Sequence, residues 1–111
     1  MTYHLEIHAT CFPRKPKNWG DKPWPQNIKK IFEVQHFPHE GSYLAAATPC
    51  DYVSSIELTK VSQRLDGTIT ANWQLPNTGY LYITNPQEWI DAGWEIICYW
   101  PSHFVDSSRH D

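Results

Sequence analysis

The amino-acid sequence predicts a mainly β fold, or an α+β fold with a small helical share, built on an antiparallel sheet of about six strands. Three observations favour this class. Residues 3–11 alternate between apolar and polar side chains, residues 68–75 do the same after an Asp-Gly pair, and helix signals are confined to short segments. A strand with one solvent-exposed face is typical of antiparallel sheets. We expect one domain over residues 1–111, with one or two short helices and a long loop.

The first predicted strand covers residues 3–11. Its apolar face should consist of Tyr3, Leu5, Ile7, Ala9 and Cys11. Residues 28–36 fit both a helical and a strand spacing, so we expect a helical turn that runs into a second strand. Residues 42–48 are ambiguous, although their tyrosine and threonine favour a further strand.

Residues 52–65 and 68–75 form the clearest local pattern, a β-hairpin. Asp66 and Gly67 supply the positive φ angles that a tight turn requires. The second arm alternates along its whole length, which predicts a half-buried strand. A turn at residues 76–79 should then lead into a strand at residues 80–84.

A short helix is predicted between residues 85 and 93. Asn85 can cap it, Pro86 suits its first position, Glu88 completes a capping box, and Gly93 can end it. Residues 94–100 are apolar enough for a central strand, and residues 107–111 should form a frayed tail.

The proline-rich loop at residues 13–27 combines opposing signals. Four prolines and a glycine indicate a loop, while Trp19 and Trp24 are side chains that a fold normally buries. Loops of this length are uncommon in compact domains unless they are functional. Two interpretations remain open: the indoles close an end of the sheet, or they contact a partner.

Charge is distributed unevenly. Residues 13–30 contain six basic residues against Asp21 alone, a net charge of +5, whereas all other positions together carry −8, so that the chain has a net charge of −3. Lysines beside Trp19 and Trp24 suit single-stranded nucleic acid. The acidic remainder and a pI of about 6.0 oppose it, because nucleic-acid-binding domains are usually strongly basic.

Cysteine use and hydropathy bear on location. Cysteines at 11, 50 and 98 cannot all pair within the chain, and no signal peptide or apolar run long enough to span a membrane is evident. We therefore expect a cytoplasmic protein with reduced thiols and no membrane partner.

No motif for catalysis, a cofactor or a metal is evident in the sequence. His4 and His8 are four residues apart, but on a strand this places them about 13 Å apart, too far to share a metal ion. His36 and His39 flank a turn without the further ligands that zinc needs. We expect neither an enzyme nor a bound cofactor or metal.

The remaining hypothesis is a protein-binding domain. Tryptophan and tyrosine are enriched in interface cores, and an acidic surface attracts a basic partner. By analogy of class, the sequence suggests an inhibitor or immunity protein that occludes the active site of a basic, nuclease-like toxin. The alternative is a nucleic-acid-binding or RNA-processing domain that uses residues 13–30. The oligomeric state is not indicated.

Two groups of candidate partner-binding residues follow from this hypothesis. The first consists of Glu88, Trp89, Asp91, Trp94 and Glu95. The second consists of Trp19, Asp21 and Trp24 in the loop. The carboxylates would take the place of substrate phosphates while an aromatic side chain fills a pocket. Alternatively, the first group is a solvated helix face over a buried Trp89.

Overall fold

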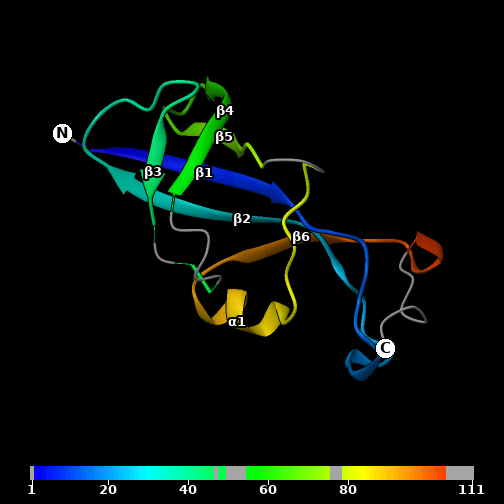
Figure 1. The fold of residues 1–111 in the computed structure, drawn as a ribbon. Helices are drawn as coiled ribbons and strands as arrows, with labels where there is room; N and C mark the ends of the chain where they lie inside the picture. The colour runs from blue at the N-terminus through cyan, green and yellow to red at the C-terminus, as the bar shows by residue number, and fades with distance from the viewer. Residues whose placement is uncertain (1, 47, 50–54, 76–78, 105–111) are drawn as a thin grey trace.

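A computed structural model describes residues 2–46, 48–49, 55–75 and 79–104. It contains one six-stranded sheet of order β3-β4-β5-β1-β2-β6 (Figure 1). The strands are β1 (Tyr3–Thr10), β2 (Pro25–Val34), β3 (Tyr43–Ala45), β4 (Ser55–Gln63), β5 (Ile69–Trp73) and β6 (Glu95–Tyr99). The helix α1 covers Pro86–Asp91, and 3-10 turns cover Lys17–Trp19 and Ser102–Phe104. The predicted mainly β class, with about six strands and little helix, is confirmed.

The sheet is mixed, whereas the sequence suggested a purely antiparallel one. β1 pairs with β2 antiparallel over its whole length, but it pairs with β5 in parallel from Leu5 opposite Ile69 to His8 opposite Asn72. The alternation within β1 cannot reveal this difference, because a period of two is the same for both directions. The parallel pair is possible because residues 11–68 supply the long connection that it needs.

Three predicted elements differ in the structure. Residues 28–31 continue β2 without a helical turn, because β2 forms ladders with both β1 and β6. Within residues 80–84 only Leu81 pairs, in an isolated bridge with Cys11. β6 lies at the sheet edge and not at its centre, with Ile97 and Tyr99 about half exposed. The turn at 76–79 lies mostly outside the described residues, and the tail at 107–111 lies wholly outside them.

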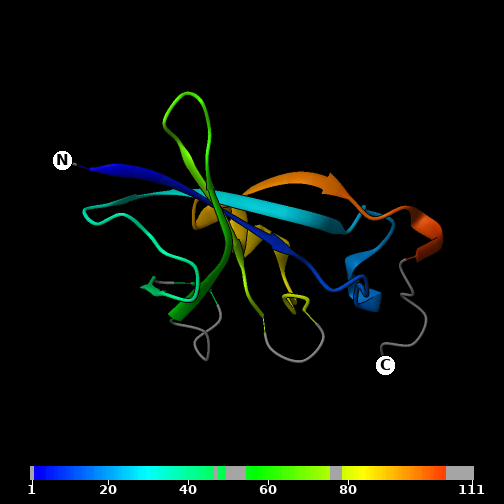
Figure 2. The ribbon, with the colours of Figure 1, turned by 90° about the horizontal axis from the view of Figure 1, so that it is seen from above.

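The predicted hairpin and helix are present, but the turn differs from the predicted tight one. Gly67 has a positive φ and Asp66 does not, and a hydrogen bond from the Arg64 amide to the Thr68 carbonyl closes a three-residue loop. Gly67 has a φ of 93°, and the Asp66 carboxylate accepts a hydrogen bond from the Thr68 amide at 2.9 Å. This turn projects away from the rest of the molecule (Figure 2). At the helix, the Asn85 side chain accepts from the Gln87 amide at 3.1 Å.

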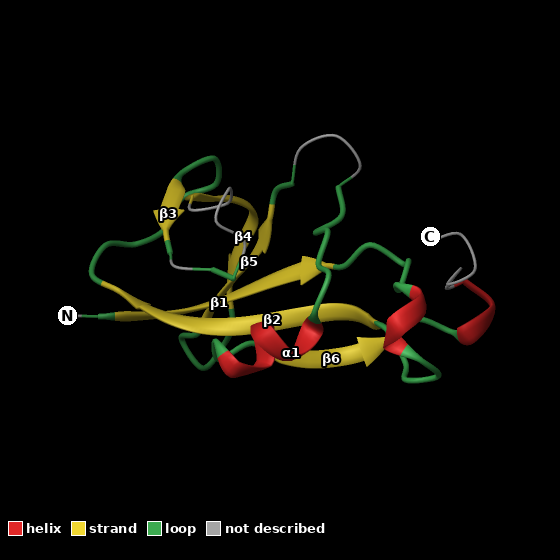
Figure 3. Ribbon diagram, turned by 60° about the horizontal axis from the view of Figure 1, so that its bottom comes forward, coloured by secondary structure: helices red, strands yellow, loops and turns green. Residues whose placement is uncertain are grey.

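Helix α1 packs against one side of the sheet, over β2 and β6 (Figure 3). Trp89 of the helix contacts Trp94 and Trp73, with ring centroids 5.6 Å and 6.3 Å away. Trp73 and Trp94 stack at 6.0 Å, and Phe32 meets Trp94 edge-on at the same distance. Since each large ring buries about 150–250 Å² of surface, this cluster supplies much of the hydrophobic stabilisation.

The two sides of the sheet differ sharply. The covered face, which lies under α1, carries Leu5, Ile7, Ala9, Ile28 and Ala71, all buried. The polar face, on the other side, carries Glu6, His8, Lys29, Thr70 and Asn72. Directly opposed residues on neighbouring strands share a face, and the pairings of His8 with Lys29 and of His8 with Asn72 fix this assignment.

Candidate functional site

The proline-rich loop closes one end of the core. Trp24 is only 1% exposed, and its indole N–H donates to the carbonyl of Phe12 at 2.6 Å. Trp19 is half-buried and meets Trp24 edge-on at 5.4 Å. The structure therefore gives the two indoles different roles, because Trp24 belongs to the core and only Trp19 remains partly at the surface.

The basic residues of positions 13–30 do not form one patch. Lys22 lies over the Trp19 ring at 5.2 Å from its centroid, within the loop. Lys29 turns to the polar face, where it pairs with Glu6 and Glu95. Lys30 turns to the covered face and donates to the carbonyl of Ala92 at 2.7 Å. β2 thus sends its two lysines to opposite sides of the sheet.

A groove of about 220 Å³ lies between this loop and helix α1. Its apolar walls are Trp19, Pro23, Pro86, Ile90, Ile96 and Tyr99. Ile90 and Tyr99 are 43% and 48% exposed, so they present apolar surface at this groove. We call this feature the loop–helix groove. Of the sequence-predicted residues, Trp19 lines this groove, and the groove lies beside α1, which carries Glu88 and Asp91.

The predicted carboxylates are divided by the fold. Glu88 and Asp91 are exposed on α1, and Asp91 accepts from Gln87, which lines the loop–helix groove, at 2.9 Å. Asp21 is exposed in the loop. Glu95 instead lies on the polar face, opposite Lys29 and 3.4 Å from its amino group. It is therefore not part of the same corner.

Trp89 and Trp94 are each 2% exposed, inside the aromatic cluster. They pack between α1 and the sheet and, like Trp24, do not reach the surface. Two residues that the sequence prediction missed, Ile90 and Tyr99, are exposed at the loop–helix groove instead. The available signal was Ile90 itself, since an apolar side chain directly after a buried tryptophan must point to a different side of a helix.

The polar face contains an ionic cluster that sequence reasoning also missed. The carboxylate of Glu6, a residue that is 3% exposed, accepts from His8 Nε2 at 2.6 Å and from Arg64 Nη2 at 2.5 Å. Lys29 Nζ lies 3.7 Å from its other oxygen. We call these four residues the Glu6 cluster. No local pattern could have revealed it, because Arg64 is 58 positions from Glu6.

The Glu6 carboxyl remains ionised in this setting. Burial by itself would raise its pKa, but the hydrogen bond from His8 and the charges of Lys29 and Arg64 outweigh burial and lower the pKa below its ordinary value of 4.5. The ionised carboxylate in turn fixes the orientation of the His8 ring. The cluster can therefore hold one imidazole in place on the polar face.

Metal binding has no evident site among the described residues, since no three histidine, cysteine, aspartate or glutamate side chains there are placed to hold an ion. His8 is bonded to Glu6, and the His39 ring packs on Phe37 at 5.6 Å.

Within the described residues, no helix has the length and apolar character needed to cross a membrane.

No family model, curated protein or solved structure matches this chain. Any functional assignment therefore rests on its side-chain geometry and charge.

Proposed function

We propose that this protein binds a basic protein through the loop–helix groove and acts as an inhibitor, in the manner of an immunity protein that occludes the active site of a nuclease-like toxin. One observation carries the proposal. An apolar groove, lined also by Lys22, lies beside the exposed carboxylates of Glu88 and Asp91, in a chain with a net charge of −3.

The size of the groove favours a protein partner. Small-molecule sites usually enclose about 300–1,000 Å³, whereas this groove encloses about 220 Å³. That volume suits a single anchoring side chain. Trp19, Ile90 and Tyr99 present exposed apolar and aromatic surface around it, which is typical of the centre of a protein interface.

The charge beside the groove favours a basic partner. Glu88 and Asp91 are exposed on α1 and Asp21 in the loop, against the groove-lining cation Lys22. Carboxylates of an inhibitor can occupy the positions that substrate phosphates take in a nuclease, and long-range attraction raises the association rate. Occlusion needs no catalytic group on this chain.

The proposal places the protein in the cytoplasm, where thiols stay reduced. The described cysteines, Cys11 and Cys98, are free. Burial, with a smaller contribution from nearby Cys98, raises the pKa of Cys11 to about 12, so that this thiol is unreactive at neutral pH.

Binding of nucleic acid or RNA processing through residues 13–30 is the alternative. It receives less support, because Trp24 is buried and Lys29 and Lys30 are engaged on opposite sides of β2. The test below includes a result, the binding of single-stranded RNA, that would support this alternative.

The test uses the full chain as bait in an extract of its native host, followed by calorimetry with each purified basic protein that it retains. We expect an equimolar complex with a nanomolar dissociation constant and loss of the partner's nuclease activity. In the double variant Glu88→Lys, Asp91→Lys the affinity should fall by about 100-fold or more, since two charges become repulsive. The control Glu33→Lys makes the same kind of change at an exposed carboxylate on β2, away from the groove, and should change the affinity less than about two-fold.

Three results would contradict the proposal. The first is that no basic protein is retained, and the second is that Glu33→Lys weakens the complex as much as the double variant does. The third is tight binding of single-stranded RNA at about 50 mM salt that falls steeply as salt rises, which would support the alternative.

A further inference from the structure

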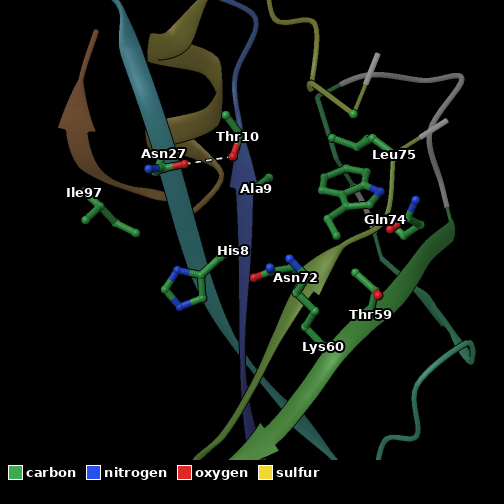
Figure 4. Close-up of a pocket in the computed structure, with 12 residues that line it drawn as sticks. His8, Ala9, Thr10, Asn27, Thr59, Lys60, Asn72, Gln74, Leu75 and Ile97 are labelled. Atoms are coloured by element: carbon green, nitrogen blue, oxygen red, sulfur yellow. Dashed lines mark hydrogen bonds between the residues drawn. The ribbon is translucent and has the colours of Figure 1, made fainter. Parts of the chain in front are cut away.

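A second groove opens where two central strands separate. β1 and β5 run parallel as far as the pair His8 and Asn72. Beyond that point the chain of β1 leads to Cys11, which forms a bridge with Leu81. β5 instead stays beside β4, and the backbone amide of Gln74 donates to the carbonyl of Glu57 at 2.8 Å. The opening between the two strands encloses about 500 Å³ (Figure 4). We call it the strand-split groove, and its volume is within the usual range for small ligands.

Four polar side chains around this groove lack partners. Thr59, Lys60, Asn72 and Gln74 line it, and none of their side chains makes a hydrogen bond to another described residue. Thr10 and Asn27, on the opposite side, are bonded to each other at 2.9 Å. The unpartnered amides, hydroxyl and amine provide donors and acceptors for a polar ligand.

The backbone places Lys60 in an unusual way. Its φ is 54°, which is uncommon for a residue other than glycine, and it lies in the irregular pairing of β4 with β5 between Thr59 and Ser62. Its amide donates to the Glu40 carboxylate at 2.9 Å, so that an interaction outside the ladder holds the bulge. Such strain is concentrated at functional sites, and here the bulge belongs to the residue that brings a positive charge to the groove.

The charge in the groove favours an anion. Among the described residues, its lining includes Lys60 and His8 but no carboxylate, although the chain as a whole is acidic. The Glu40 carboxylate is bonded to the Lys60 backbone amide, and the buried Glu6 carboxylate is bonded to His8 and paired with Arg64 and Lys29. Lys60 thus brings a positive charge to the groove, while Leu75 and Ile97 add apolar surface for a ring.

We propose that the strand-split groove binds a phosphate monoester of a hydroxylated ring compound, either a nucleoside monophosphate or a sugar phosphate. The phosphate would meet Lys60 and the side-chain amide of Asn72, and the ring would lie against the apolar wall, with Gln74 and Thr59 bonding its polar edges. This site is separate from the loop–helix groove and does not depend on the inhibitor proposal.

The test is calorimetry together with NMR of the side-chain amides, using the full chain. Uridine 5′-monophosphate, adenosine 5′-monophosphate and ribose 5-phosphate are the ester probes, and uridine and inorganic phosphate are the fragments. We expect saturable binding of at least one ester with a dissociation constant below about 1 mM, at least about ten-fold tighter than either fragment. A preference for the nucleotides or for ribose 5-phosphate identifies the source of the ester. Absence of saturable binding by every ester would overturn the proposal, as would inorganic phosphate binding as tightly as the esters.

Two variants locate the binding. Asn72→Asp places a negative charge in the groove and should weaken the ester by about ten-fold or more, while Lys60→Gly removes the amine at a φ that glycine accepts freely and should weaken it by about five-fold. The control Asn18→Asp makes the same exchange in the exposed 3-10 turn and should leave affinity unchanged. Unchanged binding by both groove variants would overturn the assignment, and thermal unfolding would verify that each variant is folded.

Discussion

The covered face and the polar face of the sheet are built from the same strands but are stabilised in different ways. On β1, Leu5 and Ile7 are fully buried on one side, while Glu6 between them is equally inaccessible on the other. The covered face gains its free energy from excluding water around large rings. The Glu6 cluster gains little net free energy, since desolvation of the charges offsets most of their attraction. The covered face therefore supplies most of the stability, while the polar face positions charged groups.

The largest expected effect tests the covered face. Trp89→Ala should lower the free energy of unfolding by about 3–5 kcal/mol, because it leaves a cavity between α1 and the sheet. Its neighbour Ile90, which is 43% exposed at the loop–helix groove, is the matched control. Ile90→Ala should cost less than about 1 kcal/mol in stability while weakening partner binding. Urea unfolding measures the stability of both variants. Equal losses of stability would refute the division between a core residue and a surface residue.

The next effect tests the polar face. Glu6→Gln should lower the free energy of unfolding by about 1–3 kcal/mol at about pH 7, because it leaves two cations and His8 without their charged partner while solvent screens part of the loss. The folded pKa of Glu6 is lowered, so its stabilising contribution is present above the ordinary value of 4.5 and is lost as pH falls through the folded value.

Unfolding of the wild type and Glu6→Gln between about pH 7 and about pH 3 measures this contribution. The difference in stability between the two proteins should be largest above pH 4.5 and should shrink below it. A difference that stays constant over this range would contradict the ionic role of Glu6.

A smaller effect separates two tryptophans within the core. The Trp24 indole donates to Phe12, whereas the buried Nε1 of Trp94 has no partner in the described part of the chain. Trp24→Phe loses ring volume and a hydrogen bond, but Trp94→Phe loses ring volume and removes an unsatisfied donor. Thermal unfolding should therefore show that the Trp24→Phe variant is less stable than the Trp94→Phe variant by about 1 kcal/mol. The reverse order would show that the bond to Phe12 adds no stability.

The smallest effect concerns the cations of the Glu6 cluster. The Arg64 side chain is 47% exposed, so water screens its pairing with Glu6. Arg64→Ala should therefore lower the free energy of unfolding by only about 0.5–1 kcal/mol. Lys29→Ala should cost a similar amount, and both losses should decrease in high salt. Unfolding at low and high salt measures them. A loss as large as that of Glu6→Gln would show that the cluster acts as a fully buried ion pair.

Local sequence signals predicted several elements correctly. The alternation of β1 and β5, the Asp66-Gly67 turn and the Asn85-Pro86 helix start each depend on residues that are neighbours in the chain, and the structure contains all of them. The strand at residues 80–84 was wrong, because pairing requires a free strand edge, and only Leu81 reaches one. The central position of β6 was wrong, because β6 is the last strand of the sheet: Ile96 borders the loop–helix groove, while Ile97 and Tyr99 stay about half exposed.

The candidate site was partly predictable for the same reason. Exposed charge on Glu88 and Asp91 follows from the helix signals around them, but the burial of Trp24, Trp89 and Trp94 depends on how the helix and loop pack on the sheet. Neither Ile90 beside Tyr99 nor Glu6 beside Arg64 could be inferred from spacing, since each pair joins distant parts of the chain.

By itself, the sequence determined the mainly β class, the hairpin, the capped helix, and a polar and an apolar face for β1, because these depend on backbone preferences and on periodicities within a few residues. Only the tertiary structure decided the parallel pairing of β1 with β5, the split that opens the 500 Å³ groove, and the meeting of loop and helix at the other groove. The physical reason is that strand direction and side-chain convergence depend on contacts between distant segments. These segments compete for the same buried surface and hydrogen bonds, and local sequence patterns do not show which pairing prevails.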